Sequence, residues 1–349
     1  MTERPAASSL YDWSMAVASL WLSAGILIDA WYHFHETVES FFEPAHALLF
    51  AGLLASYVFT AAAITAYVRQ GYPLRRALPP GYDLTRVGLV TALAGGILDM
   101  IKHTLWGFEQ GFDALLSPTH LLIGAGMFLI ILGPIRSAFM RTPPLRSLAG
   151  QLPMLFAVAS MMELIHWGTQ FIFLSGAESM NAPVPPASMP HDTLTLLSIQ
   201  YDKQGLGLLS VFVQSALTIG FSLFVSRRFR LAPGALVVML VVGNAFIAAV
   251  HASYPGQFWA VILASAAAGV CGEIFAVGAH ASAARWNAFS FFVPAVYWAV
   301  FLSVLAITMQ GLWWSHDVVA GSVLFAGLTG LFVNAVASSA IPIGASPSR

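Results

Sequence analysis

Long apolar stretches, separated by short polar segments, make up most of this chain. A run of about 20 apolar residues is enough for one helical crossing of a bilayer, so the pattern predicts about ten transmembrane helices. They are expected at residues 12–30, 45–68, 84–104, 118–136, 150–176, 205–226, 231–252, 256–279, 287–309 and 315–341. Because lipid offers no hydrogen-bond partners to an open backbone, we expect an all-α, polytopic integral membrane helical bundle, a single membrane domain over residues 1–349.

Composition agrees with that interpretation. Of the 349 residues, 58% are hydrophobic and 9% are charged, whereas about a quarter of the residues in soluble domains carry charge. The first twelve residues lack the basic segment and cleavage site of a removable signal peptide, so we expect the first span to remain as an anchor. The net charge of −1 and the absence of a basic tract give no indication of nucleic-acid binding.

The basic residues predict an orientation. Of the 15 Lys and Arg residues, all except Lys102 and Lys203 fall at the chain ends or in alternate loops between the predicted spans. Cytoplasmic loops of membrane proteins are enriched in Lys and Arg. We therefore expect a multi-pass protein of a bacterial-type inner (cytoplasmic) membrane, with both termini in the cytoplasm. Residues 177–204 then form a long, Pro-rich extracytoplasmic loop.

Histidines follow the same division. With this orientation, nine of the ten histidines lie in the outer half of a span or beyond its outer end, and His280 is the exception. Cys271 is the only cysteine, which excludes an intrachain disulfide and any multi-thiolate metal site. A metal site in this chain would have to use imidazole and carboxylate ligands.

A helical hairpin motif occurs twice. The segments GILIDAWYH and EPAHALLFAG match GGILDMIKH and SPTHLLIGAG, which predicts an internal repeat over residues 20–68 and 90–138. Each copy has Asp-x3-His at the end of one helix and Pro-x-His at the start of the next. The residues concerned are Asp29, His33 and His46 in the first copy, and Asp99, His103 and His120 in the second.

Residues four apart share one face of a helix, so the Asp and His of each exiting helix point the same way. The histidine of the returning helix faces back across the hairpin. Two imidazoles and one carboxylate suit non-haem iron, zinc or copper and do not select among them. The alternative is that these groups pair with one another or relay protons. Ionisable groups at membrane depth are costly and usually functional, and the set occurs twice, so we favour metal binding.

Further candidates have no partner fixed by spacing. Glu163 and His166 share a helix face and either add to a metal site or form a buried pair. His251, His316 and Asp317 lie at the same predicted depth as the paired sets and are additional candidate ligands. Glu273 and His280 lie toward the cytoplasm, where a structural pair is favoured over a proton path.

The pattern Asp29-x3-His33-x12-His46 looks like the metal motif in the C subunit of copper membrane monooxygenases, the particulate methane and ammonia monooxygenase family. The resemblance covers about residues 25–126. Asp99, His103 and His120 would fill that subunit's second set, although the family usually has asparagine first and a shorter gap between the histidines. The resemblance implies copper in preference to iron or zinc, a small apolar or gaseous substrate used with dioxygen, and partner membrane subunits.

Other classes of function remain open at this point. Ten spans with duplicated hairpins also fit a proton- or metal-ion-coupled transporter, but the ionisable groups gather on one face. Histidines on facing helices can ligate haem, and the long outer loop would suit an assembly subunit. Zinc-dependent membrane lipid hydrolases are disfavoured because the chain has no His-x3-His pair.

Overall fold

The computed structural model describes residues 4–35, 40–109, 111–173, 193–275, 282–308 and 312–339. Within these ranges the chain is helical and contains no strand, which confirms the prediction of an all-α fold. Nine of the described helices are long and apolar enough to cross a membrane, and a shorter apolar helix covers Ala235–His251. The chain is therefore a multi-pass membrane protein.

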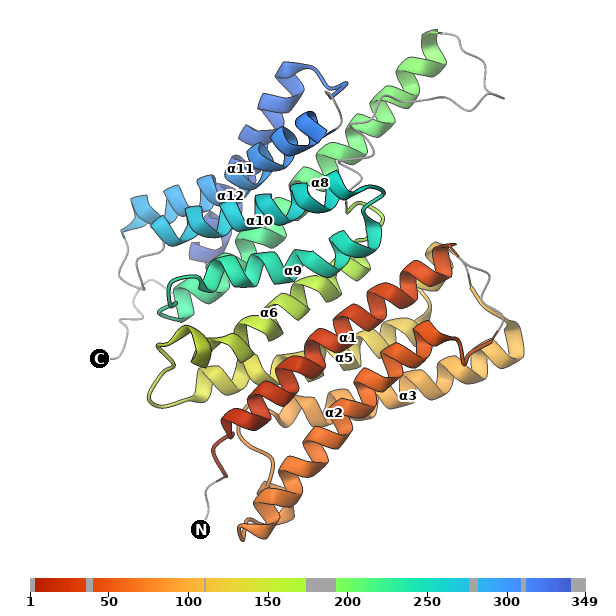
Figure 1. The fold of residues 1–349 in the computed structure, drawn as a ribbon, viewed down its shortest axis with the longest axis vertical. Helices are drawn as coiled ribbons and strands as arrows, with labels where there is room; N and C mark the ends of the chain where they lie inside the picture. The colour runs from red at the N-terminus through yellow and green to blue at the C-terminus, as the bar shows by residue number, and fades with distance from the viewer. Residues whose placement is uncertain are drawn as a thin grey trace. The chain divides into compact units, whose positions relative to one another are not determined.

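The helices follow the predicted order (Figure 1). They are α1 (Ser9–His35), α2 (Pro44–Arg69), α3 (Asp83–Trp106), α4 (Phe112–Leu115), α5 (Pro118–Met140), α6 (Leu148–Gly168), α8 (Thr193–Arg228), α9 (Ala235–His251), α10 (Pro255–Phe275), α11 (Ala283–Thr308) and α12 (His316–Ser339), with a 3-10 turn at Leu74–Arg76.

Two boundaries differ most from the prediction. Helix α6 ends at Gly168 and turns over residues 169–173, whereas the hydrophobic run suggested a helix to residue 176. Helix α8 begins at Thr193, within the segment assigned to the extracytoplasmic loop. Residues 193–204 mix leucines with polar residues that propagate a helix beyond the apolar run. The rest of that loop up to residue 192, and His280, lie outside the described residues.

Contacts divide the chain into two compact units. One comprises residues 1–168 together with Val242–His251, and the other comprises Thr169–Val241 and residues 252–349. In the second unit, α11 packs against α8, α10 and α12. There the Glu273 carboxylate accepts hydrogen bonds from the backbone N–H groups of Gly234 and Leu236, at 2.9 and 3.1 Å, and so caps the start of α9.

In the first unit α1 packs against α2, α5 and α6, and α3 packs mainly against α5. Figure 1 shows α1 in red beside α2 in orange, with α3 and α5 in the paler orange and yellow. Helices α3 and α5 approach closely because small residues face each other. A Cβ atom built on Gly126 would lie 2.5 Å from the backbone nitrogen of Ala92, so only glycine fits there.

A polar cluster at one end of this unit holds the start of α1. Asp12 is buried in the first turn of α1, where it accepts a hydrogen bond from the Tyr82 hydroxyl at 2.6 Å and pairs with Arg141. Arg141 also donates to the carbonyl of Ala7 at 3.0 Å. Buried charge is tolerated when it is paired and hydrogen-bonded. These contacts tie α1 to the residues that precede α3 and follow α5.

Candidate metal centre

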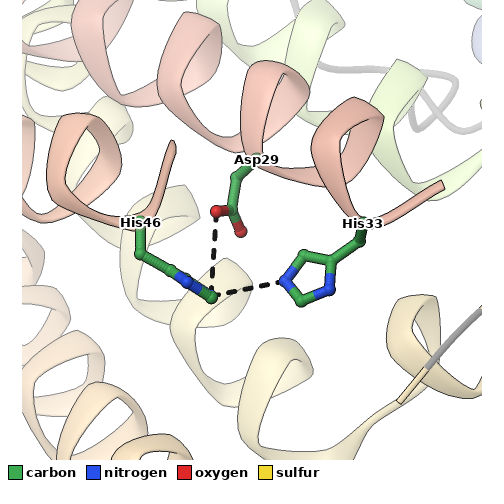
Figure 2. A group of neighbouring side chains, drawn as sticks. All are labelled: Asp29, His33 and His46. Carbon is green, nitrogen blue, oxygen red and sulfur yellow. Dashed lines mark hydrogen bonds and ion pairs between the residues drawn. The ribbon is translucent and has the colours of Figure 1, made fainter. Parts of the chain in front are cut away.

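The first predicted set of ligands comes together where α1 ends and α2 begins. Asp29 and His33 lie on the last turns of α1, and His46 lies in the first turn of α2 behind Pro44. Figure 2 shows the three side chains pointing toward one another. The Nε2 atom of His46 is 3.3 Å from Nε2 of His33 and 3.7 Å from Oδ1 of Asp29. All three residues are buried.

The second set is built in the same way by α3 and α5. Asp99 and His103 lie near the end of α3, and His120 lies in the first turn of α5. The Asp99 carboxylate is 3.3 Å from Nε2 of His103 through Oδ2 and 3.1 Å from Nε2 of His120 through Oδ1. The Thr119 hydroxyl donates a hydrogen bond to Asp99 Oδ1 at 2.6 Å. Asp99 is 1% exposed, so this is a carboxylate removed from water.

The two sets form one cluster. Besides Asp29, His33 and His46, a second group of His46, Asp99 and His103 offers ligand atoms that all lie within 4.8 Å of one another. The His33 ring centroid is 6.4 Å from that of His103 and 6.1 Å from that of His120. His46 therefore belongs to both groups and joins the two hairpins. Spacing alone had left open whether the sets lie close together.

Outer contacts orient two of the imidazoles. His120 Nδ1 lies 2.6 Å from the carbonyl oxygen of Ala114, to which it donates, and this leaves Nε2 toward Asp99. His103 Nδ1 lies 3.2 Å from the Gly107 carbonyl oxygen and 3.4 Å from Glu109 Oε2, again with Nε2 toward Asp99. In metal sites a ligating histidine typically donates its other N–H to a carbonyl or carboxylate.

Glu109 is itself held in place. It forms an ion pair with Lys102, whose ammonium also donates to the Ser117 hydroxyl at 2.8 Å. Lys102 precedes His103 on α3, and Ser117 precedes the first turn of α5. This chain of contacts connects the two helices that carry Asp99 and His120. It also explains a lysine near the end of a membrane span, where a single unpaired charge would be costly.

Several ligand atoms of the cluster are buried without a proper hydrogen bond. Four of these atoms make no hydrogen bond to any described residue: Asp29 Oδ1, Asp99 Oδ2, His103 Nε2 and His120 Nε2. Each of these atoms contacts a side-chain atom of another cluster residue at the distance given above, but without hydrogen-bond geometry. A buried polar atom that lacks a partner costs about 1–3 kcal/mol. A cation held by Asp29, His33 and His46, or by His46, Asp99 and His103, would give the unpaired atoms of that group a partner, so the residues fit bound metal.

Aromatic rings cover the cluster. The Phe108 ring stacks on His103 with centroids 4.2 Å apart, and the Phe41 ring stacks on His46 with centroids 5.2 Å apart. Phe50 adds a third ring 6.5 Å from His46. An apolar shell of this kind limits access of water and lowers the local dielectric constant around a site.

Glu163 and His166 lie on α6, and the structure gives Glu163 another partner. Its carboxylate, which is 0% exposed, accepts hydrogen bonds from the backbone N–H groups of Phe246 and Ile247 on α9, at 2.9 and 3.1 Å. His166 is buried one turn further along. Neither residue belongs to the groups of metal-ligand side chains found in the described ranges.

The remaining candidates lie at helix ends. His251 is the last residue of α9, and it is half-buried. His316 and Asp317 begin α12 and are exposed. None of the three belongs to a ligand group within the part of the chain that the structure describes.

No family model, curated protein or solved structure matches this chain. The resemblance to the C subunit of copper membrane monooxygenases thus stays a hypothesis drawn from the motif.

Sequence reasoning did not find Glu109, Thr119 or the Ala114 carbonyl. Glu109 and Ala114 lie in the segment between α3 and α5, and Thr119 lies in the first turn of α5, so their roles depend on how this part of the chain packs against the cluster. Lys102 carried a signal that could have pointed there, because it is one of two basic residues placed on the outer side. A lysine beside a candidate ligand at membrane depth requires an acidic partner nearby.

Proposed function

We propose that this chain is an integral membrane metalloprotein that binds copper in the cluster of Asp29, His33, His46, Asp99, His103 and His120. Its activity is of the oxidase or monooxygenase type, carried out by this chain alone or as a subunit of a larger membrane complex. The observation that supports this most is the convergence of both Asp/His/His sets on one cluster. Ligand atoms lie within 4.8 Å of one another in the group of Asp29, His33 and His46 and in the group of His46, Asp99 and His103.

The donor set favours a first-row transition metal. Imidazole nitrogen and carboxylate oxygen suit copper, iron and zinc, and the cluster contains no thiolate. The preference for copper comes from the resemblance of the Asp29, His33 and His46 motif to the copper monooxygenase subunit. Because His46 belongs to both groups, the cluster offers enough donors for one or two ions.

Each part of the site has a defined role in this proposal. The two aspartates supply oxygen ligands and the four histidines supply Nε2. Glu109 and the Ala114 carbonyl hold the Nδ1 protons of His103 and His120, which keeps Nε2 free for the metal. Phe41 and Phe108 exclude water. A bound metal with an open coordination position supplies the place where dioxygen and substrate would be activated.

The experiment is metal analysis of the purified protein. The full chain is expressed with copper, iron or zinc supplied in parallel, purified in detergent, and its metal content is measured by mass spectrometry. Asp29→Ala, His33→Ala and His46→Ala are expected to lose metal. His35→Ala is the matched control, because His35 lies on the same helix but is exposed and stacks on Trp31 with ring centroids 4.5 Å apart.

About one or two copper ions per chain, with a lower metal content in each of the three variants and an unchanged content in His35→Ala, would support the proposal. Folded protein without metal under all three supplies would contradict it. That result would favour a proton-coupled membrane carrier, in which the same cluster binds and releases protons.

A further inference from the structure

A pocket lies beside the cluster on the outer side of α3. Its volume is about 630 Å³. The lining residues are Ser40, Phe41 and Phe42 from the segment before α2, Met100, Ile101, His103, Thr104 and Leu105 from α3, and Phe108 after it. Among the described residues, no Asp, Glu, Lys or Arg side chain lines the pocket, so the part of its wall that the structure describes suits a neutral ligand.

The inner wall of the pocket belongs to the cluster. His103, one of the lining residues, contacts Asp99 through Nε2 at 3.3 Å. Phe41 and Phe108 also line the pocket and stack on His46 and His103. A molecule in the pocket would therefore lie against His103 itself and against the Phe41 and Phe108 rings that stack on His46 and His103.

The outer wall lies on an exposed, apolar face of α3. Met100, Ile101 and Leu105 are 37%, 44% and 64% exposed, and α3 also exposes Val90 and Leu93. A membrane-spanning helix that exposes large apolar side chains places them against the acyl chains. The pocket is thus accessible from the bilayer.

Its size leaves room for a ligand much larger than a gas molecule. Pockets for drug-sized ligands measure about 300–1,000 Å³, and one water molecule occupies about 30 Å³ in the liquid. We propose that the pocket lined by Ile101, Thr104 and Phe108 binds a neutral alkyl-chain compound dissolved in the membrane, which is the substrate of the adjoining Asp/His cluster. That the ligand is a substrate rests on the proposed function, whereas the binding of an alkyl chain in the pocket does not.

The test uses a photoreactive probe. The full chain in lipid nanodiscs is irradiated with a medium-chain alcohol that carries a diazirine, and labelled residues are located by peptide mass spectrometry. Labelling of residues 100–108 is expected to saturate and to fall about tenfold when unlabelled alcohol is added in excess. Leu93 lies on the exposed surface of α3 outside the pocket. Its labelling is expected to rise linearly with probe concentration and to stay unchanged when unlabelled alcohol is added.

Variants that fill the pocket sharpen the result. Ile101→Trp and, independently, Thr104→Trp are expected to reduce the saturable labelling about tenfold. Leu93→Trp places the same side chain on the same helix outside the pocket and is expected to leave the labelling unchanged. If the labelling of residues 100–108 rises linearly with probe concentration, as at Leu93, and does not saturate, the pocket does not bind the probe and the inference is wrong.

Two further measurements separate this inference from the metal proposal. Metal content is determined on the same samples, so saturable labelling of a metal-free protein would refute the metal and the substrate role but keep the alkyl-binding pocket. Metal-loaded protein without saturable labelling would refute the pocket alone. If a diazirine phospholipid labels the pocket and the alcohol does not compete, a lipid tail occupies it, and the substrate role is overturned.

Discussion

Nε2 of His33 and Nε2 of His46 lie 3.3 Å apart at the junction of α1 and α2. Two imidazole nitrogens bound at about 2.0–2.1 Å to one tetrahedral metal ion would be about 3.4 Å apart. The distance is therefore that of two neighbouring ligands. It also allows one N–H···N hydrogen bond, but such a bond would leave Asp29 Oδ1, which has no hydrogen-bond partner among the described residues, unsatisfied.

The shared position of His46 predicts an unequal effect of two ligand substitutions. His46→Ala removes a donor from both groups, whereas Asp29→Ala removes one from the first group only. We expect His46→Ala to lose all tightly bound metal and Asp29→Ala to retain part of it in the group around Asp99. Equilibrium dialysis against copper measures both stoichiometries. Equal losses in the two variants would show that the cluster does not divide as the geometry indicates.

Glu109 is predicted to act through His103. Its carboxylate lies 3.4 Å from His103 Nδ1 and is held by Lys102. Glu109→Gln should weaken metal binding about 10–100-fold, as is usual for a residue that orients a ligand. The number of ions bound at saturation should stay the same. Asp113→Asn, in the same loop but exposed, is the matched control. An unchanged Kd for the metal in Glu109→Gln would show that Glu109 does not contribute to metal binding.

Glu163 is predicted to stabilise the fold without binding metal. Its carboxyl group accepts hydrogen bonds from two backbone N–H groups of α9, and a hydrogen bond contributes about 0.5–1.5 kcal/mol to stability. Glu163→Gln should therefore lower the Tm of the purified protein and leave its metal content unchanged. Loss of metal at an unchanged Tm would instead place Glu163 among the ligands.

The close approach of α3 and α5 is predicted to depend on Gly126. A Cβ atom there would meet the Ala92 nitrogen at 2.5 Å, whereas one on Gly220 of α8 would meet nothing within 4 Å. Overpacking costs about 1–3 kcal/mol, so Gly126→Ala should lower the Tm. It should also weaken metal binding, because α3 and α5 carry Asp99 and His120. Gly220→Ala should do neither, and equal effects of the two changes would contradict the packing.

Much of the fold was predictable because a bilayer leaves few choices. The start of α5 at Pro118, for example, follows from a proline that loses no hydrogen bond in the first turn of a helix. The extension of α8 to Thr193 was missed because hydropathy indicates which part of a helix lies in lipid. It does not indicate how far the helix continues beyond the bilayer. The predicted orientation and internal repeat stay predictions.

For the candidate site, local spacing was informative and long-range packing was not. The four-residue separation of Asp29 and His33 places them on one helix face, so their proximity follows from the sequence. The meeting of His46 with Asp99 and His103 depends on how the two hairpins pack, which spacing cannot specify. The same is true of Glu163, whose partners on α9 lie more than eighty positions away.

Electron paramagnetic resonance with Cu²⁺ as a probe tests the central claim most directly. The full chain is loaded with less than one equivalent of Cu²⁺, and pulsed spectra record the couplings from imidazole nitrogens. The account predicts imidazole couplings in the wild-type protein and in His35→Ala, reduced or absent in His46→Ala. Copper that shows no imidazole coupling, or the same couplings in His46→Ala as in the wild type, would contradict a metal centre at the Asp/His cluster.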